Sequence, residues 1–362
     1  NIVCMTTEYV LFRLTGKWGI DRSTATPFFL AEQTTGKWHK PYLDALGITE
    51  SQLMPIGETG DLLGTTLKEV EEQTGLAQGT KVYLGSFDHP SGARANGVLN
   101  EGQLLLSCGT SWVGFFPYHD RDFILKNRML CDPFMQAKSG MWGAMFSFAQ
   151  VSKKIEYLID KYVDNSSNKY NVFNELSAQS TAGANGLEID LINGVERDLS
   201  AYAKQDICRA LMEAPAKLLK TRLDELKEKG LTFNQVFMAG GPSKSPIWYK
   251  VVEQIIGVPL NITYGVDSGA VGAAQLAYNS VEANYGTIFA AMKTSTLEAN
   301  LSPSKHNKAI PRLEAAIHTD ALAAKMDTAL QVQTANVTMR AVARYNEKAD
   351  NVLLRWNPRL EV

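Results

Sequence analysis

The sequence predicts an α/β protein with two domains, and three observations support this prediction. The chain has 362 residues, which is more than a single hydrophobic core usually holds. Residues 235–263 contain an apolar run, a glycine turn, a helical pattern and a second apolar run, which together predict a βαβ unit. Two further apolar runs, at 104–106 and 112–116, flank a short polar turn and predict a β-hairpin.

The elements expected before this hairpin are mostly helices. Residues 7–14 predict a mostly buried helix and residues 67–74 an exposed one, each followed by a glycine that ends it. Asp21 is placed to cap the start of another helix. A short helix at 42–46 and a strand at 81–85 complete this part of the chain.

Helices are also expected between the hairpin and the carboxyl end. We predict one helix from about residue 146 to 159 and a long one at 203–229, whose apolar residues recur at helical spacing. Pro215 lies inside the long helix and predicts a kink or a break there. A helix of small residues is expected from Asp267 onward.

A polar link at residues 97–102 is the expected domain boundary. We therefore predict one domain at 1–99, a second at 100–302 and a largely helical tail at 303–362, in which the sequence shows no site.

The composition excludes several classes of function. Hydrophobic residues make up 45% and charged residues 20% of the chain, and 36 Lys and Arg nearly balance 38 Asp and Glu. The sequence has no surplus of basic residues that would indicate binding to nucleic acid. It also has no polybasic run, no apolar run of membrane-spanning length and no recognisable signal peptide. The four cysteines have no paired spacing, so we expect no metal site or disulfide framework, and a cytoplasmic location.

Asp88 is the first candidate for chemistry. It follows the predicted strand at 81–85 and precedes His89, Pro90 and a run of small residues. A carboxylate at a strand end can act as a general base. The same pattern is also typical of an ordinary helix N-cap with proline in the first turn, so both interpretations stay open locally.

The turn of the predicted hairpin is the second candidate, with the sequence Cys108-Gly109-Thr110-Ser111. We expect Gly109 to adopt a backbone conformation that other residues resist. Successive N–H groups and the hydroxyls would then form a concave anion site suited to phosphate. A Gly-Thr-Ser turn between strands is otherwise simply a turn.

The third candidate is the loop Gly240-Gly241-Pro242-Ser243-Lys244, at the carboxyl end of the predicted strand 235–239. Ligands of open α/β sheets bind at such strand ends, and glycines let a flat ring lie close to the backbone. Ser245 and Pro246 are expected to start the next helix as its N-cap and first residue. The alternative is a plain βα turn.

These motifs, taken in order, resemble those of the FGGY carbohydrate kinases. The set comprises an acid at a strand end, the Gly-Thr-Ser hairpin, the Gly-Gly loop followed by Ser-Lys-Ser-Pro, and a Gly-Ala-Val-Gly-Ala-Ala helix. Residues 9–16 (YVLFRLTG), 21–25 (DRSTA), Trp38 and 53–55 (LMP) are similar to the family's first domain. The family includes ribulokinases, xylulokinases, rhamnulokinases and glycerol kinases, so the resemblance implies a two-domain, actin-like ATPase (ribonuclease H-like) fold.

The resemblance also implies a role for each candidate. Asp88 matches the base that accepts the proton of the attacking sugar hydroxyl, and we assign Asp88 and His89 to substrate binding. Residues 109–111 (Gly109, Thr110, Ser111) match the loop that holds the phosphates of ATP, and residues 240–244 match the adenosine loop. The implied cofactors are ATP and Mg²⁺. Pro242 stands where the family often has a third glycine, which removes one backbone donor and stiffens the turn.

One family element is expected but not found before residue 8. It is an Asp-containing, Gly-Thr-bearing hairpin that meets the phosphates and the magnesium. We therefore expect a truncated first domain, and a chain that alone is poorly active, binds nucleotide weakly and tends to associate.

The expected function is ATP-dependent phosphorylation of a sugar or polyol hydroxyl, with two domains that close on the substrates. A homodimer is compatible with this interpretation. Two alternatives stay open: a non-catalytic, actin-like nucleotide-binding relic or interaction subunit, and another actin-like enzyme such as an acyl-phosphate kinase.

Overall fold

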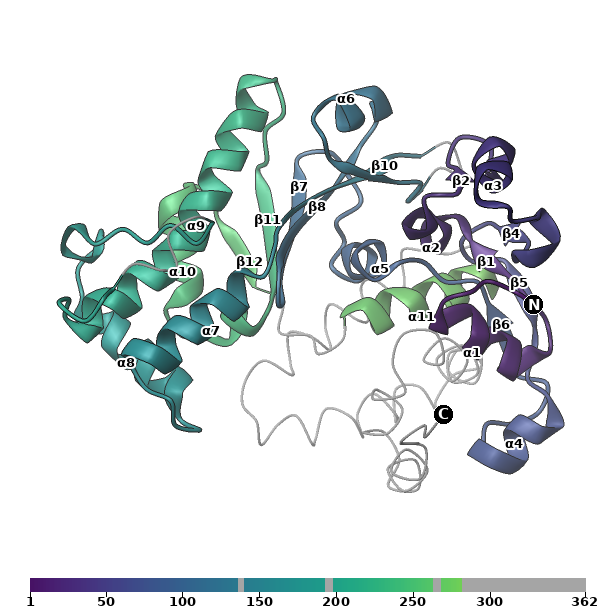
Figure 1. Cartoon of the computed structure of the whole chain (residues 1–362), viewed down its shortest axis with the longest axis horizontal. Helices are drawn as coiled ribbons and strands as arrows, with labels where there is room; N and C mark the ends of the chain where they lie inside the picture. The colour runs from purple at the N-terminus through teal and green to yellow at the C-terminus, as the bar shows by residue number, and fades with distance from the viewer. Residues whose placement is uncertain (136–139, 193–197, 263–267, 282–362) are drawn as a thin grey trace. The chain divides into compact units, whose positions relative to one another are not determined.

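The computed structural model describes residues 1–135, 140–192, 198–262 and 268–281 (Figure 1). They belong to two compact units that interleave along the chain. Of the described residues, unit 1 contains those in 1–97, 132–143 and 268–281, and unit 2 contains those in 98–131 and 144–264. The predicted tail at 303–362 and Asp267 lie outside the described residues.

Unit 1 is built from short strands and helices. Its strands pair two by two: β1 (Ile20–Asp21) parallel with β4 (Ile56–Gly57), β2 (Ala31–Glu32) antiparallel with β3 (Lys37–Trp38), and β5 (Leu62–Thr65) antiparallel with β6 (Lys81–Tyr83). Its helices are α1 (Thr6–Thr15), α2 (Arg22–Ala25), α3 (Lys40–Leu46), α4 (Lys68–Thr74), α5 (Asp88–Ala95) and α11 (Ser268–Val281). The predicted helices near residues 7–14, 42–46 and 67–74 are thus confirmed. Asp21 caps α2, since its carboxylate accepts from the Thr24 amide.

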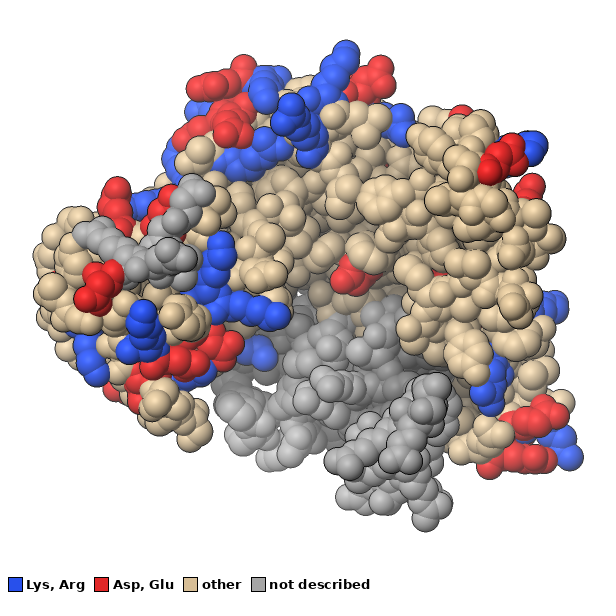
Figure 2. Space-filling view, viewed as in Figure 1, with Lys and Arg blue, Asp and Glu red and all other residues tan. Residues whose placement is uncertain are grey.

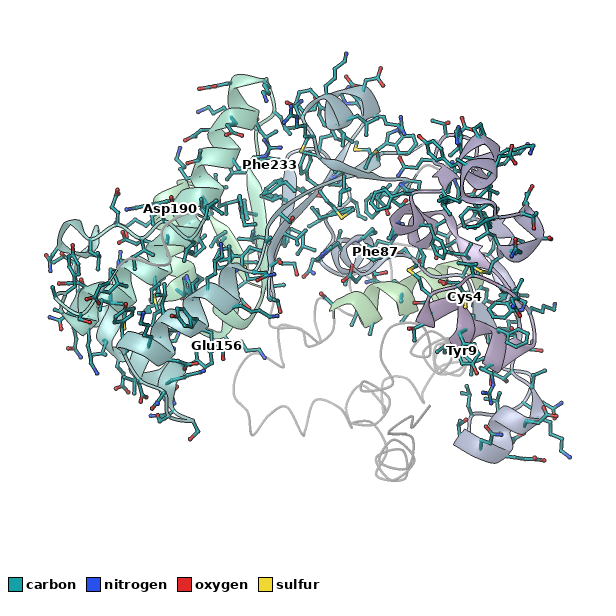
Figure 3. The ribbon with its side chains drawn as sticks, viewed as in Figure 1. Cys4, Tyr9, Phe87, Glu156, Asp190 and Phe233 are labelled. Atoms are coloured by element: carbon teal, nitrogen blue, oxygen red, sulfur yellow. The ribbon has the colours of Figure 1, made fainter. Side chains whose placement is uncertain are left out.

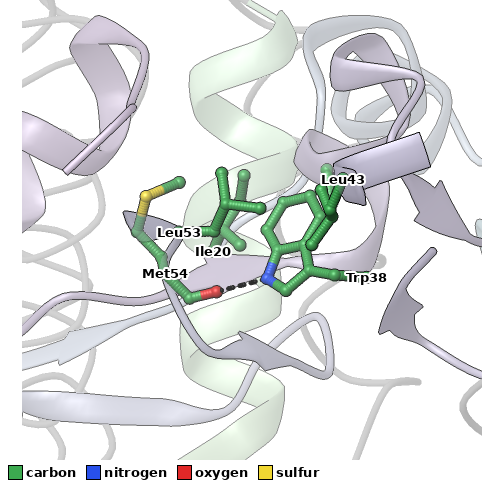
Figure 4. Close-up of a cluster of buried hydrophobic side chains, with 6 residues drawn as sticks. Ile20, Trp38, Leu43, Leu53 and Met54 are labelled. Atoms are coloured by element: carbon green, nitrogen blue, oxygen red, sulfur yellow. Dashed lines mark hydrogen bonds between the residues drawn. The ribbon is translucent and has the colours of Figure 1, made fainter. Parts of the chain in front are cut away.

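A buried cluster around Trp38 forms one core of unit 1 (Figure 4). The Trp38 indole N–H donates to the Met54 carbonyl oxygen over 2.8 Å, which satisfies its polar group inside the core. The other members are Ile20, Ala25, Leu43 and Leu53. This core fixes β1 and the start of α2, and so positions the residues that follow Asp21.

Helix α11 packs closely on α5 within unit 1. A Cβ atom added at Gly272 would lie 1.7 Å from the Ser91 carbonyl oxygen, so only glycine lets the two helix backbones approach this far. Because α5 begins at Asp88, this contact holds the helix that carries the first candidate residue.

Unit 2 is organised around a six-stranded sheet in the order β12-β11-β7-β8-β10-β9 (Figure 1). The strands are β7 (Gln103–Cys108), β8 (Trp112–Tyr118), β9 (Leu130–Asp132), β10 (Trp142–Phe148), β11 (Gln235–Gly240) and β12 (Leu260–Ile262). The helices are α6 (Arg121–Lys126), α7 (Val151–Tyr162), α8 (Lys169–Gln179), α9 (Lys204–Glu228) and α10 (Trp248–Ile256). The predicted hairpin (β7–β8, antiparallel) and βαβ unit (β11–α10–β12, parallel) are both confirmed.

Two predicted helices in this part of the chain are present but differ in detail from the prediction. The helix expected from about residue 146 is the strand β10 up to Phe148, and α7 begins only at Val151. Helix α9 continues through Pro215 without a break.

The described surface carries mixed charge. On the face shown in Figure 2, Lys and Arg side chains lie among Asp and Glu side chains. In the described ranges, no helix is both long and apolar enough to cross a membrane.

Candidate active site

The turn between β7 and β8 consists of the three residues Gly109, Thr110 and Ser111, because Cys108 pairs directly with Trp112. Gly109 and Thr110 are exposed. The expected left-handed backbone at Gly109 is wrong, because its φ lies outside that region. A Cβ added at Gly109 would meet only the Ser111 carbonyl oxygen, at 3.8 Å. What the glycine provides is therefore open space above the turn.

Residues at the start of α7 donate hydrogen bonds to the carbonyl oxygens of this turn. The Ser152 hydroxyl donates to the Gly109 carbonyl oxygen over 2.6 Å, and the Ser152 amide donates to that of Thr110 over 3.1 Å. The amide of Gln150, a residue with a φ of +56°, donates to the Ser111 hydroxyl over 3.0 Å. Gln150 and Ser152 were not predicted as site residues, because the helix was expected to start before them.

The backbone N–H groups of the turn, unlike its carbonyl groups, form no hydrogen bonds with the described part of the protein. Within the described part of the chain, the N–H groups of Gly109, Thr110 and Ser111 donate to no protein acceptor. Exposed, adjacent N–H groups of this kind are suited to binding an anion, because each keeps a partial positive charge.

The loop after β11 lies directly beside this turn. Strand β11 pairs in parallel with β7, and Gly240 is the partner of Cys108, the residue before the turn. Gly240 has a φ of +102°, and a Cβ there would lie 2.4 Å from the Cys108 carbonyl oxygen. Gly240 is therefore required both by its backbone conformation and by its contact with β7. The structure thus brings residues 109–111 and 240–244 to the same edge of one sheet.

The rest of this loop forms a 3₁₀ turn over Gly241–Lys244. A Cβ added at Gly241 would have no neighbour within 4 Å, whereas Pro242 and Ser243 are buried and Lys244 is exposed. The helix start predicted at Pro246 is wrong, because α10 begins at Trp248. The capping function of Ser245 is retained, since its hydroxyl accepts from the Trp248 amide over 3.0 Å.

Cys108 lies between the two loops but is not a candidate nucleophile. Its side chain is buried, and burial raises the pKa of its thiol well above the usual value. Since the thiolate is the reactive form, this thiol is inert near neutral pH.

Asp88 belongs to unit 1 and is the first residue of α5, directly after Phe87, which Figure 3 labels. The cap interpretation of Asp88 is wrong in detail, because Phe87 occupies the N-cap position. The carboxylate side chain is 63% exposed and accepts from the His89 amide over 2.8 Å. The His89 imidazole Nε2 lies 4.0 Å from the same oxygen, so the two predicted substrate-binding residues lie together.

A buried carboxyl group, Asp21, lies near this part of unit 1. Burial is the main cause that raises its pKa to about 7, and the neighbouring Asp132 carboxylate raises it further. The Thr24 amide donates to it over 2.8 Å and acts in the opposite direction. Within the described ranges, no group of three or more His, Cys, Asp or Glu residues could hold a metal ion.

Known proteins resemble this chain over most of its described length. Autoinducer-2 kinase of Klebsiella pneumoniae is 26% identical over 299 residues, covering 75% of this chain and 55% of the relative. Xylulose kinase of Bacillus subtilis is 28% identical over 289 residues, covering 75% of this chain and 56% of the relative. The chain therefore spans about half the length of the curated relatives it matches.

The fold has counterparts among solved structures. The crystal structure of xylulose kinase from Rhodospirillum rubrum superposes with a TM-score of 0.66 at 21% identity, covering 84% of this chain and 69% of that one. The α/β architecture is accordingly the actin-like ATPase fold that was predicted.

Two family models match the chain in the expected order. Residues 1–94 match the N-terminal domain, and residues 104–280 the C-terminal domain, of one family. Both loops on the β7–β11 edge lie in the second match and Asp88 in the first, and the chain belongs to the FGGY family of carbohydrate kinases.

Proposed function

We propose that this chain carries out ATP-dependent phosphorylation of a hydroxyl group on a sugar or polyol. The observation that carries the proposal is the pairing of Gly240 with Cys108, which sets the Gly-Thr-Ser turn beside the Gly-Gly loop in unit 2. One loop offers amides without acceptors, and the other offers exposed backbone without side chains. A nucleotide needs both, because its phosphates are anionic and its base and ribose need close backbone approach.

In this proposal residues 109–111 bind the phosphates of ATP and residues 240–244 the adenosine. Ser152 and Gln150 keep the turn in place by engaging its carbonyl and hydroxyl oxygens. The N–H groups then face the phosphates without reorganising, which is how preorganised donors stabilise charge in a transition state.

Asp88 is the proposed general base. An exposed carboxylate accepts the proton of the sugar hydroxyl as that oxygen attacks the γ-phosphorus of ATP. The bond from the γ-phosphorus to the bridging oxygen breaks, and ADP leaves. His89, beside Asp88, is proposed to contact the sugar.

Magnesium would enter with the nucleotide. Mg²⁺ is commonly held by phosphates, waters and one or two carboxylates, so it needs no cluster of protein ligands. When bound, the metal would neutralise charge on the phosphates.

The names of relatives suggest which acceptors to test. Similar proteins are described as kinases of xylulose, autoinducer-2, gluconate and glycerol. We propose a small polyhydroxylated acceptor of this class. None of the four cysteines forms a disulfide in the described part of the chain, which suits the reducing cytoplasm in which we place the reaction.

The nucleotide site is tested by titrating ADP into the parent chain and Gly109→Val in a calorimeter. Valine would fill the open space above the turn, so we expect at least about tenfold weaker binding, or about 1.4 kcal/mol. Gly64→Ala, whose backbone is not left-handed and whose added Cβ would lie 3.4 Å from Thr15, serves as the control for altering a glycine. Equal ADP affinity in the parent and Gly109→Val would count against residues 109–111 as a phosphate site.

Turnover is tested separately, with a coupled ADP-release assay over a panel of ketoses, polyols and sugar acids. Acceptor-dependent ADP release supports the proposal. ADP binding without release on any acceptor would favour a nucleotide-binding protein that does not catalyse transfer.

A further inference from the structure

A fully buried carboxylate, Asp132, is the last residue of β9 and the first residue of the segment 132–143 that belongs to unit 1. Its exposed fraction is 0%, and its side chain accepts two hydrogen bonds. The Ser23 hydroxyl donates to Oδ2 over 2.7 Å, and the Phe134 amide donates to Oδ1 over 2.8 Å. A buried carboxylate is costly unless it is hydrogen-bonded, so Asp132 holds these two donors firmly in place.

The Ser23 hydroxyl links Asp132 to the backbone beside Asp88. Its single proton is donated to Asp132, which leaves its oxygen to accept from the Phe87 amide over 3.1 Å. Phe87 is the N-cap residue of α5 and immediately precedes Asp88. A carboxylate–hydroxyl–amide chain therefore ends one residue before the candidate base.

Arg94 belongs to the same buried network and binds Ser86, the residue before Phe87. Its Nη1 donates to the Ser86 hydroxyl over 3.0 Å, and its Nη2 donates to the Phe134 carbonyl oxygen over 2.6 Å. Its guanidinium also lies 4.5 Å from the centre of the Phe134 ring. The positive charge favours the ionised form of Asp132 and partly offsets the effect of burial, which raises the pKa of that carboxyl.

This network matters because the Asp88 side chain is itself little restrained. It is 63% exposed, and its hydrogen bond goes to the adjacent His89 amide. The position of its carboxylate therefore depends on the backbone at residues 86–88. A displacement of about 1 Å at a catalytic group can cost on the order of 10²-fold in rate.

We propose that Asp132 is a positioning residue for Asp88: through the Ser23 hydroxyl it fixes the Phe87 amide, and with it the backbone that presents the Asp88 carboxylate. This inference rests on the proposed role of Asp88 in catalysis, although the network itself does not.

The test compares Asp132→Ala, Asp132→Asn and Ser23→Ala in the full chain. The control is Glu8→Ala, which removes a second buried carboxylate of unit 1 whose bond goes to the amide of Met5, three residues before it. Two readouts need no turnover. They are the hydrogen exchange rate of the Phe87 amide and the ¹³C resonance of the Asp88 carboxyl, which is assigned by its loss in Asp88→Asn.

We expect Asp132→Ala and Ser23→Ala to speed Phe87 exchange by about fivefold or more, since one lost hydrogen bond is worth about 1 kcal/mol or more. Both should also shift or broaden the Asp88 resonance. Asp132→Asn keeps an oxygen acceptor and should lie between these variants and the parent. Glu8→Ala should leave both signals unchanged, even if it lowers stability.

Unchanged Phe87 exchange in Ser23→Ala would overturn the inference, as would a faster exchange that leaves the Asp88 resonance unmoved. If Asp132→Ala fails to fold, Ser23→Ala and Asp132→Asn decide the matter. With an active acceptor, kcat should fall in Asp132→Ala while the KM for ATP stays unchanged. Failure of the proposed function would instead appear as undiminished turnover in Asp88→Asn, and that result leaves the two spectroscopic readouts intact.

Discussion

The exposed Asp88 carboxylate is the residue on which the proposed chemistry depends. Asp88→Asn keeps the size of the side chain and an oxygen that can accept from the His89 amide. It removes only the ability to take up a proton, so we expect kcat to fall by about 10²–10⁴-fold with little change in ADP affinity. A coupled assay and a calorimetric titration measure the two quantities. Turnover within a few-fold of the parent would exclude Asp88 as the base.

Asp21 predicts how stability depends on pH. The buried carboxyl keeps its proton up to pH about 7, whereas an unfolded Asp releases its proton near pH ~3.9. Between these values the native state binds more protons than the unfolded state, so the free energy of unfolding falls as pH rises. One such group contributes at most about 1.4 kcal/mol per pH unit.

Asp21→Asn should flatten this dependence between about pH 5 and 7, because an amide stays neutral and can still accept from Thr24. Urea unfolding across that range measures the slope. Burial also raises the pKa of the Asp132 carboxyl, so this group should leave a residual slope in Asp21→Asn. The exposed Asp44→Asn is the control, and an identical slope in the parent and Asp21→Asn would contradict the assignment.

At the scale of elements, the contact between α5 and α11 is set by backbone rather than side chains. Gly272→Ala should gain about 1 kcal/mol in helix propensity. It also places a methyl group 1.7 Å from a carbonyl oxygen of α5, which no rotamer change relieves. Overpacking typically costs about 1–3 kcal/mol, so we expect net destabilisation in urea unfolding. In Gly64→Ala the new methyl group would lie 3.4 Å from Thr15, and a loss as large in that control would argue against a specific clash.

The elements that the sequence predicted best are those marked by local signals. Helix α4 and the β7–β8 hairpin have clear periodicity and end at glycine or at a short polar turn. The end of strand β10, residues 146–148, was included in the predicted helix because the five residues 142–146 of this strand are all buried, so it lacks the alternation that distinguishes strands. Its packing depends on a contact with Gly114 of β8, where an added Cβ would lie 2.2 Å from the Phe146 ring.

The candidate site also has parts that local sequence predicted and parts that only the tertiary fold determines. Glycine-rich turns after apolar runs pointed to residues 109–111 and 240–244, but the pairing of Gly240 with Cys108 is a property of the sheet. Asp132 carried no signal at all, because its partner Ser23 lies 109 residues away in the chain. Polar contacts of such separation are specified by the tertiary fold rather than by local pattern.

For the whole molecule, the two nucleotide loops belong to one unit and Asp88 to the other. Adding ADP at about 100 times its Kd should stabilise the folded state by about 2.7 kcal/mol. The largest slowing of hydrogen exchange should appear in peptides that cover residues 106–112 and 240–248. Gly109→Val at the same ADP concentration is the comparison. Protection spread evenly over both units, or absent from those peptides, would contradict the assigned site.

The interleaving of the two units also determines when each can fold during synthesis. Every residue of unit 2 has been made once the chain reaches residue 264, whereas unit 1 still lacks α11. Until Ser268 and the residues after it leave the ribosome, α5 has no partner for the face that packs against Gly272. The amino-terminal segment must therefore wait, partly unpaired, through the translation of about half of the chain, which at about 5–20 residues per second amounts to roughly ten seconds or more. The growing chain would expose the apolar residues of unit 1 to chaperones long before the helix that covers them exists.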